Sequence, residues 1–213
     1  MQSNGFANTI YLKPLAMRNS PLKQLRIGLH RNLIRYGIDV RKRRADRRLL
    51  EQVIFPELLR NSDYQRILFV GCAWYTLHYP NIFRDREFIT MEINPAEAKY
   101  GGPNHIVDSC ENILDHFQDN SLDVIVFNGV YGFGLNELPA INHALQAIYQ
   151  SLREKGLFIF GWNDLPETAP YRITELTGLD AFVPFAFPPC KTTIYESDSK
   201  NRHRFHFYRK EQR

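Results

Sequence analysis

The chain has 213 residues, of which 44% are hydrophobic, 13% aromatic and 23% charged. Disordered chains lack the apolar and aromatic side chains that offset the entropy of ordering, so this composition excludes a disordered protein and predicts one substantial core. No apolar run approaches the roughly 20 residues that cross a bilayer, and we expect no transmembrane segment. The N-terminus also lacks the charged-then-apolar order of a signal peptide.

Cysteine and histidine spacing argues against disulfides and metals. Cys72, Cys110 and Cys190 are odd in number, widely spaced and form no C-x-x-C pair. We therefore expect neither a disulfide framework nor a structural zinc site, and a reducing cytoplasm fits best. His203 and His206 fall on opposite faces of one predicted strand, and the other histidines show no ligand spacing, so we predict no metal.

Charge divides the chain into two parts. Residues 1–60 carry 13 Lys and Arg against 4 Asp and Glu, whereas residues 61–213 carry 14 against 19. We predict a basic helical extension over 1–60, acting as a lid or cap, and a mildly acidic α/β domain over 61–213.

Two helices are expected in the basic extension. Ser20 and Pro21 provide an N-cap and a first helical residue, and leucines then recur at helical spacing as far as Gly37. A second helix is predicted over about 44–60, where Pro56 should distort the last turn.

Short apolar runs alternate with amphipathic stretches after residue 66, which predicts a parallel α/β sheet. A long helix is expected over about 138–154, ended by Gly156, and a short one over about 171–177. The last two strands are too close in sequence for a helical crossover, so they should pair antiparallel. The fold class is a doubly wound, mostly parallel, seven-stranded Rossmann-like sheet with an antiparallel last strand. The predicted strands are 66–70, 87–93, 105–109, 123–130, 157–162, 181–187 and 203–209.

Two acids and a glycine stand at the ends of the first three strands. Ligands of doubly wound sheets bind at the carboxyl ends of the strands, and Gly71 lets the backbone turn sharply there. Glu92 follows 21 residues later, where a carboxylate can accept both hydroxyls of a ribose. Asp108 can accept an adenine amino hydrogen. Each acid alone is as readily a helix N-cap or a solvated loop residue.

In these residues the chain resembles class I S-adenosylmethionine-dependent methyltransferases. ILFVGCAWY resembles the first motif of that family, DVIVFNGVYGFG the fourth-strand motif, and SLREKGLFIFGW the segment before the antiparallel pair. The resemblance covers about residues 60–210 and implies S-adenosylmethionine as cofactor and S-adenosylhomocysteine as product. It places ten residues at the cofactor: Gly71, Cys72, Ala73, Trp74, Glu92, Ile93, Asp108, Ser109, Asn128 and Gly129.

The first motif departs from the family pattern at three positions. Phe69 stands where the family usually has an acid, and Ala73 and Tyr75 replace its second and third glycines. Tyr75 puts a bulky ring where the methionine end of the cofactor is normally cradled. A degenerate relative that keeps the sheet but has lost the reaction is therefore one alternative. A nicotinamide site fits poorly, since only the first glycine of G-x-G-x-x-G survives.

Acceptor-side candidates follow the fourth and fifth strands. Asn128 and Tyr131 have the spacing of the Asn-Pro-Pro-Tyr motif of amino-group methyltransferases, without its prolines. We take Tyr131 and Asp164 as catalytic candidates, although Asp164 is equally well a loop carboxylate. Ordinary packing is the alternative for the aromatic residues. The predicted substrate-binding residues are Tyr75, Tyr131, Phe133, Trp162 and Asn163.

The basic extension leaves the partner open. We expect a small-molecule or conjugated anionic substrate, with methyl transfer to an oxygen or nitrogen atom. An RNA methyltransferase that uses the basic helices is a less favoured alternative, because no recognised nucleic-acid module accompanies them. A solvated face, or a contact in a homodimer, explains the charge without any ligand.

Overall fold

The computed structural model describes most of the second of two compact units. The chain divides into residues 1–41 and residues 42–213. The first predicted helix lies outside the described residues, apart from Leu25 and Leu29, which are helical and exposed. The predicted boundary at residue 60 stays a prediction. The described residues are 25, 29, 45–197 and 200–211.

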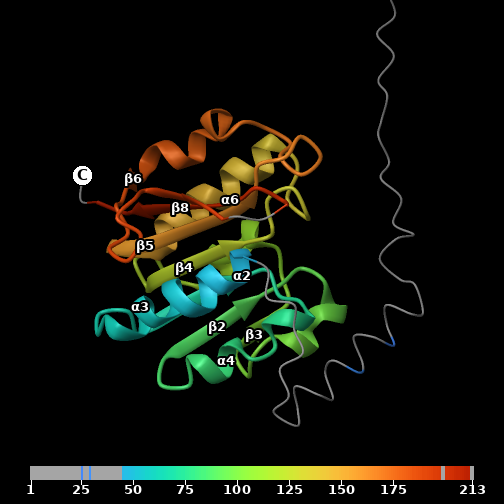
Figure 1. The fold of residues 1–213 in the computed structure, drawn as a ribbon, viewed down its shortest axis with the longest axis vertical. Helices are drawn as coiled ribbons and strands as arrows, with labels where there is room; N and C mark the ends of the chain where they lie inside the picture. The colour runs from blue at the N-terminus through green and yellow to red at the C-terminus, as the bar shows by residue number, and fades with distance from the viewer. Residues whose placement is uncertain (1–24, 26–28, 30–44, 198–199, 212–213) are drawn as a thin grey trace, which may run out of the picture. The chain divides into compact units, whose positions relative to one another are not determined.

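Eight strands form a single sheet in the order β3-β2-β1-β4-β5-β8-β6, with β7 also paired to β8 (Figure 1). The pairs among β1 to β5 are parallel, and β8 pairs antiparallel with β5, β6 and β7. This confirms the predicted fold class. The strands are β1 (Arg66–Val70), β2 (Glu87–Met91), β3 (His105–Ile106), β4 (Leu122–Asn128), β5 (Leu152–Asn163), β6 (Val183–Pro184), β7 (Ile194–Glu196) and β8 (His203–Arg209).

The strand order reverses beside β1, which pairs with both β2 and β4. From β1 the chain runs outward through β2 and β3, then returns to lay β4 against the other edge of β1. Such a reversal opens a crevice at the carboxyl ends of the two strands, where ligands of doubly wound folds bind. The loops after β1, β2 and β4 therefore meet at one edge of the sheet.

The sequence predicted seven strands, and the sheet has one more. The additional strand, β7, has three exposed residues and pairs only with β8. It lacks the buried alternation by which a strand is recognised in a sequence. The predicted antiparallel pairing of the last two strands is correct, since Val183 and Pro184 face Arg209 and Tyr208.

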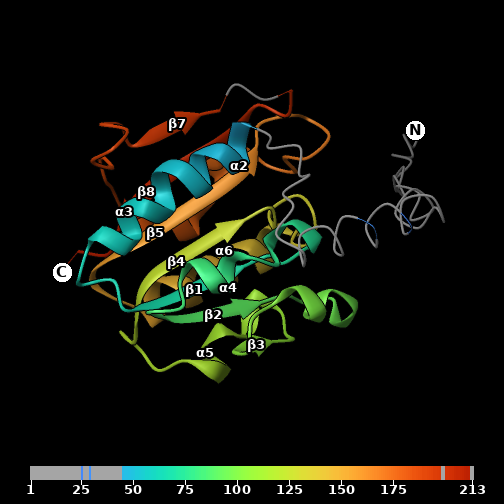
Figure 2. The same cartoon turned by 60° about the horizontal axis from the view of Figure 1, so that its bottom comes forward.

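Helices cover both faces of the sheet (Figure 2). One face carries a continuous helical segment over residues 45–60 together with α4, and the other carries α5 and α6. The helices are α2 (Ala45–Leu49), the π-helical turn η2 (Leu50–Ile54), α3 (Phe55–Arg60), α4 (Tyr79–Ile82), α5 (Ile113–His116) and α6 (Leu138–Ser151). The 3-10 turns are η3 (Trp74–Thr76), η4 (Pro95–Tyr100), η5 (Cys110–Asn112), η6 (Ile173–Glu175) and η7 (Thr177–Ala181).

Pro56 distorts the helix one turn earlier than predicted. The distortion is the π-helical turn η2, in which the Phe55 N–H donates to the Leu50 carbonyl oxygen. A proline ring clashes with the carbonyl four residues before it, and a wider turn relieves that clash. The helix thereby continues to Arg60.

Two other helices differ from the prediction. The long helix ends at Ser151 rather than near Gly156, because Leu152 already begins β5. Lys155 then takes a positive φ of 59°, which accompanies a register shift between β4 and β5. The helix expected over 171–177 is instead the two 3-10 turns η6 and η7.

Phe69 fills the centre of one face of the sheet. Its ring is fully buried and meets the edges of Phe55 and Tyr79, with ring centroids 6.5 and 5.2 Å away. Phe88 lies 6.2 Å away on the neighbouring strand. The position where the family that the sequence resembles usually has an acid is therefore part of an aromatic cluster.

We expect Phe69→Ala to lower the free energy of unfolding by about 3–5 kcal/mol, the usual cost of removing a buried ring. Urea denaturation followed by circular dichroism measures this change. Phe133→Ala, which truncates a ring that is 43% exposed, is the control and should change stability by less than about 0.5 kcal/mol. Equal effects of the two substitutions would contradict this packing.

Among the described residues, no helix combines the length and apolar character needed to cross a membrane.

Candidate functional site

The backbone of the loop after β1 packs closely against the end of β4. Gly71 has a φ of +97°, and a Cβ atom there would lie 2.6 Å from the Asn128 carbonyl oxygen and 3.0 Å from Val130 Cγ2. Both the conformation and the space restrict this position to glycine. The Gly71 N–H also donates to the Met91 carbonyl oxygen at 2.9 Å, which ties the loop to β2.

Glu92 is fixed between two backbone segments. Its Oε2 accepts the Cys72 N–H at 3.2 Å, and its Oε1 accepts the Asn94 N–H at 3.0 Å. A carboxylate oxygen can accept two hydrogen bonds, so each oxygen keeps one acceptor position. The side chain is therefore oriented in advance and can still accept two hydroxyl groups.

The turn that follows Cys72 is held by hydrogen bonds between its own residues. The Ala73 N–H donates to Thr76 Oγ1 at 3.1 Å, and the Thr76 N–H donates to the Ala73 carbonyl oxygen at 2.8 Å. Burial raises the pKa of Cys72 to about 12, so its thiol stays protonated at neutral pH. Cys72 is thus a small apolar residue of the loop rather than a nucleophile.

Two partly exposed rings complete this turn. Trp74 and Tyr75 meet edge to face with centroids 5.6 Å apart. The guanidinium of Arg47, from α2, lies 4.0 Å from the centroid of the Tyr75 ring. Tyr75, predicted at the substrate, is thus held by a cation–π contact with a helix that covers the sheet.

Asp108 has partners within its own turn. Its Oδ1 accepts the Ser109 N–H at 2.7 Å and Asn112 Nδ2 at 2.8 Å, and its Oδ2 lies 2.7 Å from His116 Nε2. These hydrogen bonds, led by that with His116, lower the pKa of Asp108, which stays ionised. Oδ2 is the oxygen with room for a further donor.

Apolar side chains flank the two acids. Ile93, next to Glu92, is 58% exposed, and Val107, next to Asp108, is 47% exposed. Both stand at the carboxyl ends of neighbouring strands, where a flat apolar group can lie against them. Val107 was not among the predicted site residues, and its position before an acid at a strand end was the signal for it.

A buried polar cluster joins three strands at the same edge. His203 Nδ1 lies 2.7 Å from Asn163 Oδ1, and His203 Nε2 lies 2.9 Å from Asn128 Oδ1. All three residues are more than nine-tenths buried. Burial lowers the pKa of His203 to about 4, so the ring is neutral at pH 7. A neutral ring has one N–H, so one of the two asparagines presents its amide NH2 group, rather than its oxygen, to the other ring nitrogen. Next to the cluster, Gly129 has a φ of +74° and open space beside its Cα.

The Tyr131 hydroxyl is engaged by backbone. It donates to the Tyr171 carbonyl oxygen and accepts the Tyr171 N–H at 3.0 Å. The ring is fully buried and meets Trp162 edge to face at 5.9 Å. Burial raises the pKa of Tyr131, which keeps the phenol protonated. This geometry fixes the segment before η6 and leaves Tyr131 without an open path to an acceptor.

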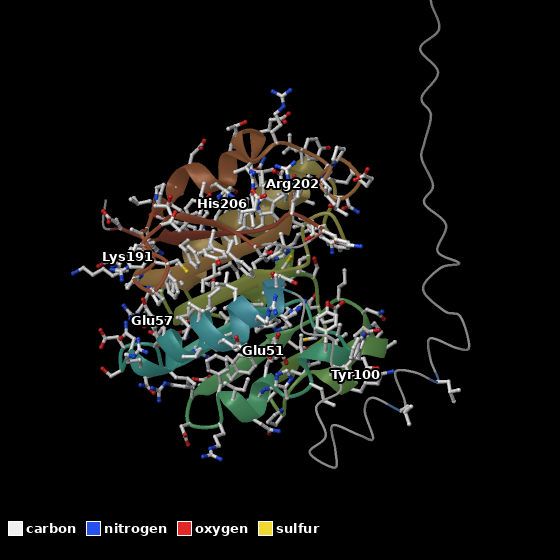
Figure 3. The ribbon with its side chains drawn as sticks, viewed as in Figure 1. Glu51, Glu57, Tyr100, Lys191, Arg202 and His206 are labelled. Carbon is white, nitrogen blue, oxygen red and sulfur yellow. The ribbon has the colours of Figure 1, made fainter. Side chains whose placement is uncertain are left out.

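Asp164 belongs to an ion-pair network. Its Oδ2 lies 3.1 Å from Arg202 Nη2 and 3.0 Å from Arg204 Nη1. Glu196 also pairs with Arg204, at 2.8 Å. Arg202 lies at the end of the sheet toward which β5 points, and Glu57 at the opposite end (Figure 3). Asp164 is therefore at the expected edge, but it neutralises two arginines.

The structure thus gathers the predicted residues into two groups. Gly71, Cys72 and Glu92 form one, and Asn128 with Asn163 forms the other, with His203 as a partner that the sequence did not suggest.

No group of three or more His, Cys, Asp or Glu side chains among the described residues is placed to hold a metal ion.

Several solved structures share the fold of this chain. No protein-family model matches the sequence, and no curated protein does either. The N-methyltransferase NodS from Bradyrhizobium japonicum WM9 is similar over 78% of this chain and 99% of its own, with a TM-score of 0.57 and 16% identity. The chain has the fold of the S-adenosylmethionine-dependent methyltransferases. This confirms, at the level of the fold, the resemblance seen in the sequence.

Two further structures agree. A TehB-like S-adenosylmethionine-dependent methyltransferase from Corynebacterium glutamicum is similar over 91% of this chain and 100% of its own, with a TM-score of 0.59 and 16% identity. NodS in complex with S-adenosylhomocysteine is similar over 76% of this chain and 88% of its own, with a TM-score of 0.57 and 15% identity. At these identities the likeness concerns the fold.

The buried His203 makes stability depend on pH. Its pKa is about 4 in the folded chain and about 6.5 when unfolded, so the unfolded state binds the proton first as the pH falls. Stability is therefore lost below pH 6.5, by about 2 kcal/mol between pH 7 and pH 5. We expect His203→Gln to remove this share of the acid sensitivity in urea denaturation at the two pH values.

The matched control is His143→Gln, which changes an exposed histidine of α6 and should retain the wild-type difference between the two pH values. An unchanged difference in His203→Gln would show that His203 is not held neutral.

Proposed function

We propose that the protein is a methyltransferase that uses S-adenosylmethionine and methylates an oxygen or nitrogen atom of a small or conjugated metabolite. The main support is Glu92, whose carboxylate is oriented by two backbone N–H groups at the edge of the sheet where strand order reverses. The shared fold of S-adenosylmethionine-dependent methyltransferases is the second support.

The nucleoside half of the cofactor fits the first group of residues. Glu92 would accept hydrogen bonds from the ribose hydroxyls. Gly71 has no side chain, so a ligand can come close to the backbone of the loop. Ile93 and Val107 would flank the adenine ring, with Asp108 Oδ2 as an acceptor for its amino group. Trp74 and Ser109 stand on the same loops and stay predicted neighbours of the cofactor.

S-adenosylmethionine, when bound, supplies a methyl group on a sulfonium that is already activated. The protein then has to align the acceptor and exclude water. We infer that Asn128 and Asn163, which both contact His203, and the open space beside Gly129 would lie toward the acceptor. Asn128 and Gly129 also stay predicted neighbours of the cofactor. A general base is needed only for an acceptor that must lose a proton. Tyr131 and Asp164, both engaged by protein groups, are better suited to shaping this side.

The alternatives make different predictions. A degenerate relative would keep the fold without binding the cofactor, and the altered turn at Ala73 and Tyr75 is the reason to consider it. An RNA methyltransferase would use the basic residues before Ala45, all of which lie outside the described residues, so no described contact favours it. The cytoplasmic location and a homodimer stay predictions; Cys72, Cys110 and Cys190 are free thiols.

Calorimetry with S-adenosylhomocysteine tests the proposal. We expect a saturable binding isotherm and a raised melting temperature, because a ligand that binds the folded state stabilises it. No heat and no thermal shift at millimolar ligand would favour the degenerate relative and reject the enzyme.

Glu92→Gln should weaken the binding of S-adenosylhomocysteine by about 2 kcal/mol, or about thirtyfold, since charge-assisted hydrogen bonds to the ribose are lost. The control is Glu87→Gln at the opposite end of β2, where the side chain pairs with Arg66 at 2.9 Å. Its affinity should match the wild type. Equal affinities of both variants would remove Glu92 from the site.

A further inference from the structure

We propose that Asp46 and Arg47, adjacent residues of α2, bind the amino-acid end of the cofactor. Arg47 would bind its α-carboxylate and Asp46 its α-ammonium group. This inference rests on the proposed function and adds a subsite to it. Both residues lie in the basic extension predicted over 1–60, and neither was among the predicted site residues.

The loop after β1 has few donors left for a carboxylate. The N–H groups of Gly71, Cys72, Ala73 and Thr76 all donate within the protein, to Met91 O, Glu92 Oε2, Thr76 Oγ1 and Ala73 O. A glycine-rich loop offers such N–H groups to a ligand. Because this loop uses most of them internally, an anionic ligand group beside it needs a donor from another element.

Arg47 is a charged donor that contacts this loop. Its guanidinium lies on the Tyr75 ring, 4.0 Å from the centroid, and Nη1 donates to the Tyr79 hydroxyl at 3.3 Å. The side chain is only 14% exposed. A guanidinium has five N–H donors in a planar fork that matches a carboxylate. The stack on Tyr75 and the bond to Tyr79 fix that fork, while most of its donors have no partner among the described residues.

Asp46 carries a buried oxygen without a partner. The residue is 8% exposed, and its Oδ2 lies 3.6 Å from Arg47 Nε. Its Oδ1 accepts no hydrogen bond from the described residues. Burying an unpaired carboxylate oxygen costs free energy, so such an atom in a native fold calls for an explanation. A cationic donor from a ligand would supply the missing partner.

Asp46 and Arg47 lie at the edge of the sheet where the amino-acid end of the cofactor would lie. The helical segment over 45–60 runs antiparallel to the strands, so α2 lies at their carboxyl ends and α3 at the opposite end (Figure 1). The charges of both Asp46 and Arg47 act on His203, which in turn lies 2.9 Å from Asn128 Oδ1. The pair is therefore next to the β1 loop, which Arg47 contacts through the Tyr75 ring.

The amino-acid end of the cofactor carries charges complementary to those of Asp46 and Arg47. It carries a carboxylate and an ammonium group on one carbon, so two adjacent protein charges of opposite sign can each meet their complement. An anionic acceptor would pair with Arg47 but leave the Asp46 oxygen unpaired and repelled. A cationic acceptor would do the opposite. The methionyl group of the cofactor satisfies both residues at once.

Two ligands separate this subsite from the rest of the cofactor site. S-adenosylhomocysteine has the amino-acid end, whereas 5′-methylthioadenosine keeps the nucleoside and the sulfur but lacks it. By calorimetry we expect Asp46→Asn and Arg47→Gln to weaken S-adenosylhomocysteine about tenfold or more. The affinity for 5′-methylthioadenosine should change less than about twofold. Arg48→Gln, at the exposed next position of α2, is the control and should bind both ligands like the wild type.

The outcomes distinguish the two proposals. Equal weakening of both ligands, or no weakening of either, overturns the role of Asp46 and Arg47 and leaves the proposed function intact. Absence of binding by the wild-type protein overturns both. If a variant fails to fold, the wild type alone gives the answer, since it should bind S-adenosylhomocysteine about tenfold or more tightly than 5′-methylthioadenosine. Equal wild-type affinities overturn the inference.

Discussion

A close backbone approach at the point of strand reversal determines the whole candidate site. Gly71 lies so near the end of β4 that a Cβ atom would meet the Asn128 carbonyl oxygen at 2.6 Å. This contact brings the β1 loop within reach of Glu92 on one side and of the buried Asn128 on the other. The parallel pairing of β1 with both β2 and β4 makes the approach unavoidable. The two halves of the site are therefore positioned by the sheet itself.

The sequence was informative wherever a side chain's role follows from its position on a strand. Near-continuous apolar runs located β1 and β4, and strand ends located Gly71 and Glu92, because parallel strands end at a common edge. It was uninformative for β7, whose three residues are exposed. Pro56 was recognised as a disruption, but the wider turn that accommodates it depends on packing against the sheet.

The polar partners in the interior could not be predicted from the sequence. The alternation of β8 gave the face of His203 but not its contacts with Asn128 and Asn163, which come from two other strands. Asp46 is the single acid among the residues of 41–48, which are mostly basic, and nothing in that context indicates a buried acid. Its burial depends on the tertiary contact between α2 and the sheet. The sequence placed Asp164 at the correct edge of the sheet, but its ion pairs with Arg202 and Arg204 could not be predicted.

The central claim is that the oriented carboxylate of Glu92 and the loop at Gly71 hold a nucleoside at the carboxyl ends of the strands. A crystal structure of the wild-type protein with S-adenosylhomocysteine tests it most directly. We predict electron density for both ribose hydroxyls within hydrogen-bond distance of the Glu92 carboxylate and for adenine beside Ile93. A nucleoside bound elsewhere, or a Tyr75 ring that occupies its place in crystals grown with saturating ligand, would contradict the account.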